Sequence, residues 1–413
     1  MRVWQIAAVP ADERTEQQAA RLLDYLVASD SAAASVRSEL QTLQQNPPKA
    51  EKHTAMALKQ RAEPRTTNVH IRGEFLDKGV EVQIGTPAFL PSLQPRNDRP
   101  DRLDLARWMF QPDNSLPPRV YVNRIWQVYF GRGLVNTDND FGTQGDPPSH
   151  PELLDWLANY LIDHNWSMKQ LHRHILLSAT YRQSSDYRAD LAEVDPDNTL
   201  LAVQRRLRVS AETVRDLALS SCGLLDRRIS GPSVFPPLPA GTIELAFVDV
   251  INRGPWQVSE GSDKYRRGLY TFFQRTSPYP MLMTFDAPDS NVTCTRREKS
   301  NTPLQALTLW NDSVFMECAQ NLALELTRVE GTTSDRIQLA CIRCLGRTPA
   351  SAESDVLQQL FTASLAAFEA DPEATARALE QITLPEGRSA AELAAWASVG
   401  RALLNLDEFI TRQ

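Results

Sequence analysis

Apolar residues recur at helical spacing over most of the sequence, and this periodicity limits the fold more than any other feature. After Pro151, the residues Leu153, Leu154, Leu157 and Leu161 return at intervals of one to four positions. This spacing places them on one face of an α-helix. Similar patterns run from the middle of the chain to its C-terminal end. We therefore predict a mainly α fold.

Polar capping residues mark where several of these helices are expected to begin. Ser149 with Glu152, and Ser167 with Gln170, have the spacing of a capping box, in which side chains satisfy the free backbone N–H groups of the first turn. Thr302 marks a third start, with proline at the first helical position. Each cap stabilises a helix by about 1 kcal/mol, so the sequence specifies these three starts.

Residues 66–90 follow a two-residue period instead. Val69 and Ile71 alternate with polar side chains, and a second run over residues 80–84 does the same. This is the period of a half-buried strand. Turn-forming residues at 77–79, with the sequence Asp-Lys-Gly, lie between the runs. The fold class is thus mainly α (α+β), a multi-helix globular body with a small β-hairpin element.

The patterns divide the chain into four parts. Residues 1–62 are polar and helix-like, and we interpret them as the remnant of a preceding region. Residues 63–100 hold the hairpin and a proline-rich connector. Residues 101–300 form a helical core domain with an irregular or β insert near 229–300. Residues 301–413 form a C-terminal helical subdomain.

Composition and charge exclude several classes of protein. The 413 residues are 42% hydrophobic and carry a net charge of −7, which is typical of a folded, soluble chain. No basic stripe dominates, so a nucleic-acid partner is not expected. No segment approaches the roughly 20 apolar residues of a membrane helix, so no membrane span is expected. The first residues lack the pattern of a signal peptide. Two interpretations remain: the protein is cytoplasmic, or the chain is the C-terminal part of a longer polypeptide. We favour the second.

The cysteines do not form a recognised cofactor motif. The chain has five, an odd number at irregular spacing, which argues against a disulfide framework. Cys341 and Cys344 form a Cys-x-x-Cys pair, but Leu345 stands where covalent haem attachment needs His. No second ligand pair completes a zinc site. We interpret the pair as two half-buried free thiols, and no cofactor is predicted in this chain.

The loop at 136–150 is dense in polar side chains. Side chains with oxygen atoms stand at Asn136, Asp138 and Asp140, which is similar to the start of a calcium loop. The match fails at Phe141, where a calcium loop needs glycine. Turns held by Asx hydrogen bonds are the alternative interpretation. If an ion binds here, Asp138 and Asp140 are the candidate metal ligands.

The same loop supplies the candidate catalytic residues. His150 lies close to Asp140 in sequence, and a His beside a carboxylate can act as a general base. Arg124 and Arg182 are candidates to hold an anion. The Gly-x-Ser-x-Gly nucleophile motif does not occur. A hydrogen-bonding loop histidine is the simpler interpretation of His150.

Several longer stretches together resemble a known family. They are EPR (63–65), IRG (71–73), NRIW (123–126), FGRGLV (130–135), DFG (140–142), PSHPELLDWL (148–157), LSATYRQS (177–184), PYPM (278–281), FDAPD (285–289), TPLQAL (302–307) and LNLDEF (404–409). Over about residues 63–411, the chain resembles the planctomycete-specific C-terminal domain of unknown function of planctomycete cytochrome C domain-containing proteins.

The resemblance implies a context rather than an activity. Members of that family are typically large and exported, with a signal peptide, a haem-binding cytochrome-like module and a second uncharacterised domain ahead of this one. An extracytoplasmic (periplasmic) location is implied, with haem only in the upstream module. The implied partner is that upstream cytochrome-like domain or another protein. No catalytic residue is carried over from the family.

Three functional hypotheses follow. The first is an accessory or binding module of an extracytoplasmic, redox-linked multidomain protein. The second is an enzyme, a hydrolase or oxidoreductase acting on complex carbohydrate, with its site in the loop 136–150. The third is a purely structural domain. A deep pocket that gathers Asp140, His150 and Arg124 would favour the enzyme, and a flat apolar patch would favour the module.

Overall fold

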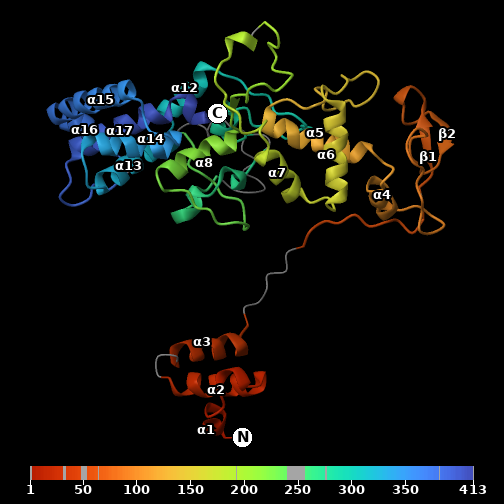
Figure 1. Cartoon of the computed structure of the whole chain (residues 1–413), viewed down its shortest axis with the longest axis horizontal. Helices are drawn as coiled ribbons and strands as arrows, with labels where there is room; N and C mark the ends of the chain where they lie inside the picture. The colour runs from red at the N-terminus through yellow and green to blue at the C-terminus, as the bar shows by residue number, and fades with distance from the viewer. Residues whose placement is uncertain are drawn as a thin grey trace. The chain divides into compact units, whose positions relative to one another are not determined.

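The structure is a computed structural model of the chain. It describes residues 2–30, 34–47, 54–63, 65–191, 193–239, 256–274, 277–380 and 382–412. The chain consists of two compact units, an N-terminal unit of residues 1–84 and a C-terminal unit of residues 85–413. The boundary falls between the hairpin and the proline-rich connector. Helices dominate both units, and the strands form two small antiparallel pairs (Figure 1). The predicted fold class is confirmed.

The N-terminal unit contains a pair of polar helices and a hairpin. Its elements are α1 (Val3–Ala7), η1 (Ala11–Glu13), α2 (Glu16–Ser29), α3 (Ala34–Gln45), β1 (Thr67–His70), η2 (Ile71–Gly73) and β2 (Lys78–Val82). The helix α2 begins at a capping box, in which the Thr15 hydroxyl accepts a hydrogen bond from the Gln18 backbone N–H. Local sequence chemistry therefore places this helix start.

The hairpin forms as predicted, but two of its expected details are wrong. β1 and β2 pair antiparallel, with Thr67 opposite Val82. The turn includes η2, where Arg72 has a φ of 52°, and Lys78 and Gly79 belong to β2 rather than to the turn. The strands are not half-buried, because the apolar Val80 side chain is 72% exposed. A two-stranded sheet has no second layer of its own to cover that face.

The C-terminal unit is built from helices joined by short 3-10 turns and two very short strands. The helices are α4 (Arg102–Met109), α5 (Leu116–Phe130), α6 (Pro151–Asp163), α7 (Met168–Leu177), α8 (Ala211–Ser221), α11 (Pro280–Thr284), α12 (Pro303–Asn311), α13 (Ser313–Arg328), α14 (Thr333–Leu345), α15 (Ser351–Ala370), α16 (Pro372–Ala378) and α17 (Ala390–Leu404). The shorter elements are η3 (Ala189–Leu191), β3 (Leu207–Arg208), η4 (Gly261–Tyr265), η5 (Gly268–Tyr270), η6 (Asp407–Ile410) and β4 (Thr411–Arg412). No described helix combines the length and the apolar character that crossing a membrane requires.

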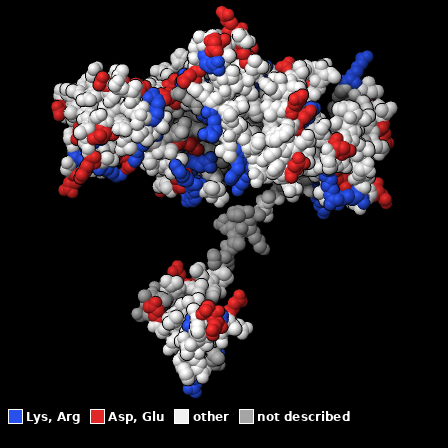
Figure 2. Space-filling view, viewed as in Figure 1, with Lys and Arg blue, Asp and Glu red and all other residues white. Residues whose placement is uncertain are grey.

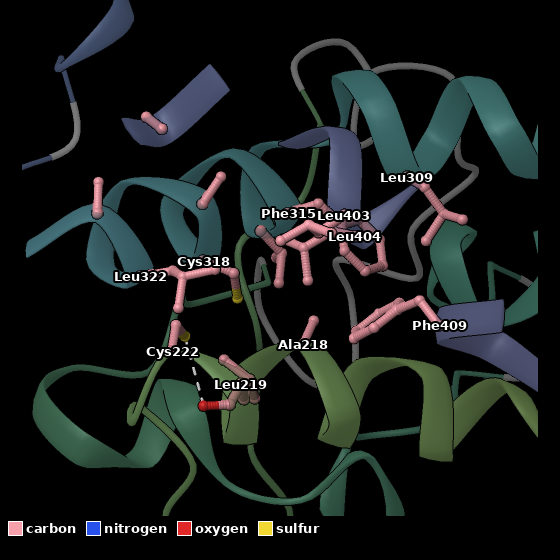
Figure 3. Close-up of a cluster of buried hydrophobic side chains, with 14 of the residues drawn as sticks. Ala218, Leu219, Cys222, Leu309, Phe315, Cys318, Leu322, Leu403, Leu404 and Phe409 are labelled. Atoms are coloured by element: carbon pink, nitrogen blue, oxygen red, sulfur yellow. Dashed lines mark hydrogen bonds between the residues drawn. The ribbon is translucent and has the colours of Figure 1, made fainter. Parts of the chain in front are cut away.

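The larger of two hydrophobic cores lies where α8, α13, α14 and α17 meet. Ala218, Phe315 and Leu403 come together there from three of these helices (Figure 3). At the contact of α13 with α17, a Cβ added to Gly400 would lie 3.3 Å from the Ala319 carbonyl oxygen. Small residues thus let the two helices approach closely. Each large apolar side chain buried in such a core stabilises the fold by about 1.5–3 kcal/mol.

The smaller core lies among α5, α6 and α7. Trp126 stacks on Phe130 with ring centroids 4.1 Å apart, and Val122, Leu157 and Leu171 are buried beside them. In α6, the predicted Leu154, Leu157 and Leu161 are buried in this core.

Two of the three predicted helix starts are confirmed. The Ser167 hydroxyl accepts a hydrogen bond from the Gln170 backbone N–H at the start of α7. The Thr302 hydroxyl accepts one from the Gln305 backbone N–H at the start of α12. Both therefore act as N-caps, as their sequence positions predict.

The third predicted start, at Ser149, is wrong by one residue. α6 begins at Pro151, which makes His150 the N-cap residue, and the His150 side chain makes no capping hydrogen bond. The Ser149 backbone N–H instead donates to the Leu134 carbonyl at 2.8 Å. Proline is favoured at the first helical position, and together with this tertiary contact it sets the helix start.

A short antiparallel pair ties the C-terminal end to the middle of the chain. Leu207 in β3 lies opposite Arg412 in β4. The Arg412 guanidinium also donates to the Tyr129 carbonyl at the end of α5, at 2.6 Å. The β part of the insert expected near 229–300 is limited to isolated bridges in the described residues, such as Val234 with Thr271. Residues 240–255 and 275–276 of that insert lie outside the described part.

Charged side chains of both signs are interspersed over the face drawn in Figure 2, and Lys and Arg side chains gather near the middle of the C-terminal unit. This is the region in which α8 and the C-terminal end of the chain lie (Figure 1). The basic charge on this face is therefore local and does not form a continuous stripe.

Candidate functional site

The loop 136–150 leaves α5 through a tightly fixed turn. α5 ends at Phe130, and its C-cap residue Gly131 adopts a left-handed φ of 76°. The fully buried Asn123 side chain then holds Val135, because its Oδ1 accepts from the Val135 N–H at 2.8 Å and its Nδ2 donates to the Val135 carbonyl at 3.0 Å. Paired hydrogen bonds of this kind fix the backbone direction of the loop before its polar residues begin.

Within the loop, Asp140 has a structural task. Its Oδ1 accepts a hydrogen bond from the Gly142 N–H at 2.7 Å, and its carbonyl accepts one from the Thr137 hydroxyl at 2.9 Å. The Thr137 hydroxyl in turn accepts from the Asp146 N–H at 2.8 Å. The backbone is tight here, because a Cβ added to Gly145 would lie 2.1 Å from the Asp140 carbonyl oxygen. This is the Asx-turn arrangement that the loop composition predicts as its alternative to an ion site.

A second loop, residues 287–299, is closed at its base by a carboxylate, and we call it the clasped loop. Asp286 accepts hydrogen bonds from the Ser300 N–H at 2.7 Å and from the Ser300 hydroxyl at 2.8 Å. The buried Gln305 side chain, from the first turn of α12, donates to Asp286 at 3.3 Å and to the Thr284 carbonyl at 3.0 Å. The two ends of the loop are therefore held together.

The two loops line an open pocket of about 530 Å³, which we call the loop pocket. Its lining residues are Asp138, Asn139, Pro288, Asp289, Val292, Thr293, Cys294, Thr295, Arg296 and Glu298. The lining is mostly polar, and it carries charges of both signs. A pocket of this volume falls in the range of small-molecule sites.

Asp138 is the most informative residue of the loop pocket. Asp138 is only 8% exposed, and its Oδ2 has no hydrogen-bond partner among the described residues. A buried acceptor without a partner costs about 1–3 kcal/mol, and more when the group is charged. Asp138 therefore places a carboxylate with one unsatisfied, buried oxygen beside the pocket.

The residues predicted from the sequence are not brought together around this pocket. Among the four candidate catalytic residues, Asp140 is used in the loop backbone, and His150 Nδ1 lies 3.0 Å from the Ser149 hydroxyl. Arg124 and Arg182 are exposed. No hydrogen bond or ion pair in the described part of the chain connects these four residues. Of the candidate metal ligands, Asp138 lines the pocket, whereas Asp140 does not.

The described residues contain no group of three or more His, Cys, Asp or Glu side chains placed to hold a metal ion. All five cysteines are described, and all are free thiols. Burial raises the pKa of Cys344 to about 12 and also raises that of Cys341. The pair lies in the last turns of α14, where it packs as part of the larger core.

Sequence reasoning missed the clasped loop and its exposed thiol, Cys294. The Cys294 Sγ donates to the Arg296 carbonyl at 3.0 Å. One signal was present, because the FDAPD and TPLQAL stretches that carry the family resemblance flank this loop on both sides. Residues that close the loop, Asp286 and Gln305, lie within those stretches.

A comparison with protein families identifies the family of this chain. Residues 101–361, more than half of the chain, match the family PSD1, described as a protein of unknown function (DUF1553). The chain belongs to this family, and the matched region includes both loops of the loop pocket. No curated protein and no solved structure matches the chain. The family description states no activity that could be carried over.

Proposed function

We propose that this chain is a binding module whose loop pocket receives a polar, hydroxyl-rich ligand of the complex carbohydrate class. The observation that carries the proposal is the buried Asp138 carboxylate, which lines a pocket of about 530 Å³ and whose Oδ2 has no hydrogen-bond partner in the part of the chain that the structure describes. A sugar hydroxyl is a neutral donor of the kind that this oxygen needs. Hydrogen bonds to charged groups contribute about 1.5–3 kcal/mol each.

The remaining lining fits the same ligand class. Asn139, Thr293 and Thr295 supply groups that both donate and accept hydrogen bonds, and Arg296 and Glu298 supply charged partners of opposite sign. A ligand with many hydroxyl groups can satisfy donors and acceptors together. A purely apolar ligand would leave them buried and unpaired.

We also propose the wider context as an accessory module of an extracytoplasmic, cytochrome-linked multidomain protein. The support is the resemblance to planctomycete cytochrome C domain proteins. The proposed partner is the upstream cytochrome-like domain, which would hold the haem, and no cofactor is proposed for this chain. A periplasmic location is part of the same proposal. Fractionation of the native organism's cells, followed by immunoblotting, tests the location directly.

The binding proposal is tested by screening the purified chain against an array of neutral and acidic oligosaccharides. We expect a saturable interaction with at least one of them. Asp138→Asn should weaken that affinity about tenfold or more, since one charge-assisted hydrogen bond is lost. Asp146→Asn is the matched control, because Asp146 is exposed in the same loop and does not line the pocket. Binding unchanged in Asp138→Asn would contradict the proposal.

The enzyme alternative, a hydrolase or oxidoreductase with its site at 136–150, makes a different prediction. It requires that Asp140→Asn abolish turnover of an oligosaccharide while the melting temperature stays nearly unchanged. The Asp140 Oδ1 that accepts from the Gly142 N–H predicts instead that Asp140→Ala, which has no acceptor, loses stability, whereas Asp140→Asn keeps this hydrogen bond. Measuring turnover and melting temperature on one preparation separates the two hypotheses. The structural-domain alternative predicts no binding to any member of the array.

A further inference from the structure

Arg132 is presented by an unusually constrained turn on the side of α5 that faces β3. It stands between Gly131 and Gly133, and neither glycine tolerates a side chain. A Cβ at Gly131 would lie 2.4 Å from Leu207 Cδ2, and one at Gly133 would lie 2.5 Å from the Val135 carbonyl oxygen. The backbone therefore packs closely against Leu207 at Gly131 and against the Val135 carbonyl at Gly133. The position of Arg132 is fixed by packing on either side of it.

Arg205 lies opposite Arg132 and has the same charge. Its guanidinium donates to the Asp197 backbone carbonyl. Burial lowers the pKa of Arg205, and the nearby positive charge of Arg132 lowers it further. In the described part of the chain, no carboxylate lies within ion-pair distance of either guanidinium. Two like charges thus face each other without a direct acidic partner.

The neighbouring carboxylates, those of Asp195 and Asp197, do not form ion pairs with either arginine in the described part of the chain. Asp195 accepts hydrogen bonds from the Thr199 and Leu200 backbone N–H groups, each at 2.8 Å. The carboxylates of Asp195 and Asp197 act on Arg205 only through space, and they favour its charged form. The two guanidinium groups therefore keep N–H donors that the described residues do not use.

The two arginines line a common hollow. Its other lining residues are Trp126, Phe130, Gly133, Leu134, Ser149, Asn198, Thr199 and Leu201. The aromatic pair forms an apolar part of the wall, and Ser149, Asn198 and Thr199 are polar residues of the same lining. The hollow has a volume of about 20 Å³, and about 10–15 Å³ is enough for one water-sized atom. One or two oxygen atoms of an anionic group fit inside, while the rest of the group stays at the opening.

We propose that the hollow between Arg132 and Arg205 binds a single phosphate or sulfate group. A tetrahedral oxyanion supplies several acceptor atoms to two guanidinium forks at once, and charge-assisted hydrogen bonds of this kind are among the strongest in proteins. Binding also removes the repulsion between the two arginines. This site is separate from the loop pocket, which shares none of its lining residues.

Calorimetric titration of the purified full chain with inorganic phosphate, and separately with sulfate, tests the proposal. Chloride at equal ionic strength is the reference for non-specific charge effects. We expect saturable 1:1 binding with a Kd below about 1 mM. Arg205→Gln should weaken it at least tenfold. Arg206→Gln is the matched control, because Arg206 is the adjacent, exposed arginine outside the hollow. The affinity of the Arg206→Gln variant for the anion should stay within twofold of that of the unmodified chain.

The separate titrations with phosphate and with sulfate show which of the two anions the site binds. Binding of only one of the two anions supports the site and identifies its ligand type. Arg132→Gln serves as a second variant, with far-UV circular dichroism to verify folding, if Arg205→Gln does not fold. Saturation by neither anion would overturn the proposal. Equal losses in Arg205→Gln and Arg206→Gln would also overturn it, because they would indicate a diffuse charge effect.

Discussion

Asp286 and Ser300 are joined twice, since the Asp286 carboxylate accepts both the Ser300 backbone N–H at 2.7 Å and its hydroxyl at 2.8 Å. The two residues stand 14 positions apart in sequence. Asp286 also adopts a left-handed φ of 64°, which Asp tolerates better than most residues. This clasp holds one wall of the loop pocket in place, so the stability of the fold and the shape of the pocket depend on the same contact.

Asp286→Ala should therefore destabilise the protein by about 2–4 kcal/mol. The change leaves the Ser300 donors unpaired, and it places alanine at a positive φ. Asp289→Ala is the control in the same loop, because the Asp289 carboxylate accepts only from Asn291 in the described structure. Urea unfolding of the three proteins measures the difference. Equal free energies of unfolding for the two variants would show that the clasp is not structurally important.

Gly133→Ala should cost about 2 kcal/mol or more. The added methyl group would lie 2.6 Å from Asn123 Nδ2 as well as close to the Val135 carbonyl, so either the buried Asn123 or the backbone must shift. Gly85→Ala is the control, since a Cβ there meets no atom within 4 Å. Thermal melts of both variants measure the effect. A Gly133→Ala protein as stable as Gly85→Ala would mean that the turn around Arg132 is not tightly packed.

The stability of the C-terminal unit should depend on pH through Glu353. Hydrogen bonds from Arg347 and from the Ala350 backbone N–H lower the pKa of Glu353 from 4.5 to about 2. Because the folded-state pKa is lowered, this stabilisation is complete above pH 4.5 and is lost as the pH falls towards 2. Its size is roughly 1 kcal/mol at most, since both side chains are more than a third exposed and screened by solvent. Glu353→Gln should therefore be less stable than the unmodified chain at pH 7, and the gap should narrow between pH 4.5 and 2. A constant gap in urea melts over that range would contradict the assignment.

One thiol per chain should react with Ellman's reagent under native conditions. Cys294 is exposed at the loop pocket, whereas Cys222, Cys318 and Cys341 are buried, and burial raises the pKa of Cys344. A thiol reacts as the thiolate, so burial and a raised pKa both protect it. Cys294→Ser should abolish the fast reaction, and denaturation of the unmodified chain should release all five thiols. Two or more fast thiols in the native protein would show that the helical core opens readily.

Features that depend on neighbouring residues in sequence could be predicted, and features that depend on distant contacts could not. The caps at Ser167 and Thr302 are local, and the sequence places both correctly. Ser149 has the same pattern, but its hydrogen bond to the Leu134 carbonyl takes it out of the capping position. A sequence motif cannot show such a contact across a loop.

The candidate site shows the same limit. Asp138 and Asp140 are equivalent in the sequence, yet Asp140 binds its own loop and Asp138 faces the loop pocket. The difference arises from the clasped loop, about 150 residues later, which lines the same pocket as Asp138. The sequence pointed to loop 136–150 and named Asp138 as a candidate metal ligand, and Asp138 lines the pocket. It did not identify the opposite wall, because no chemical motif marks residues 288–298.

The most direct test of the central claim, that a ligand occupies the loop pocket beside Asp138, is the alkylation rate of Cys294 with iodoacetamide. The rate is measured by mass spectrometry, with and without a saturating concentration of the oligosaccharide that binds best on the array. At about ten times the Kd of the unmodified chain, we expect the oligosaccharide to slow alkylation at least fivefold in the unmodified chain and in Asp146→Asn. In Asp138→Asn, with at least tenfold weaker binding, the same concentration should slow alkylation no more than about twofold. An alkylation rate that the bound oligosaccharide leaves unchanged in the unmodified chain would place the ligand elsewhere and contradict the account.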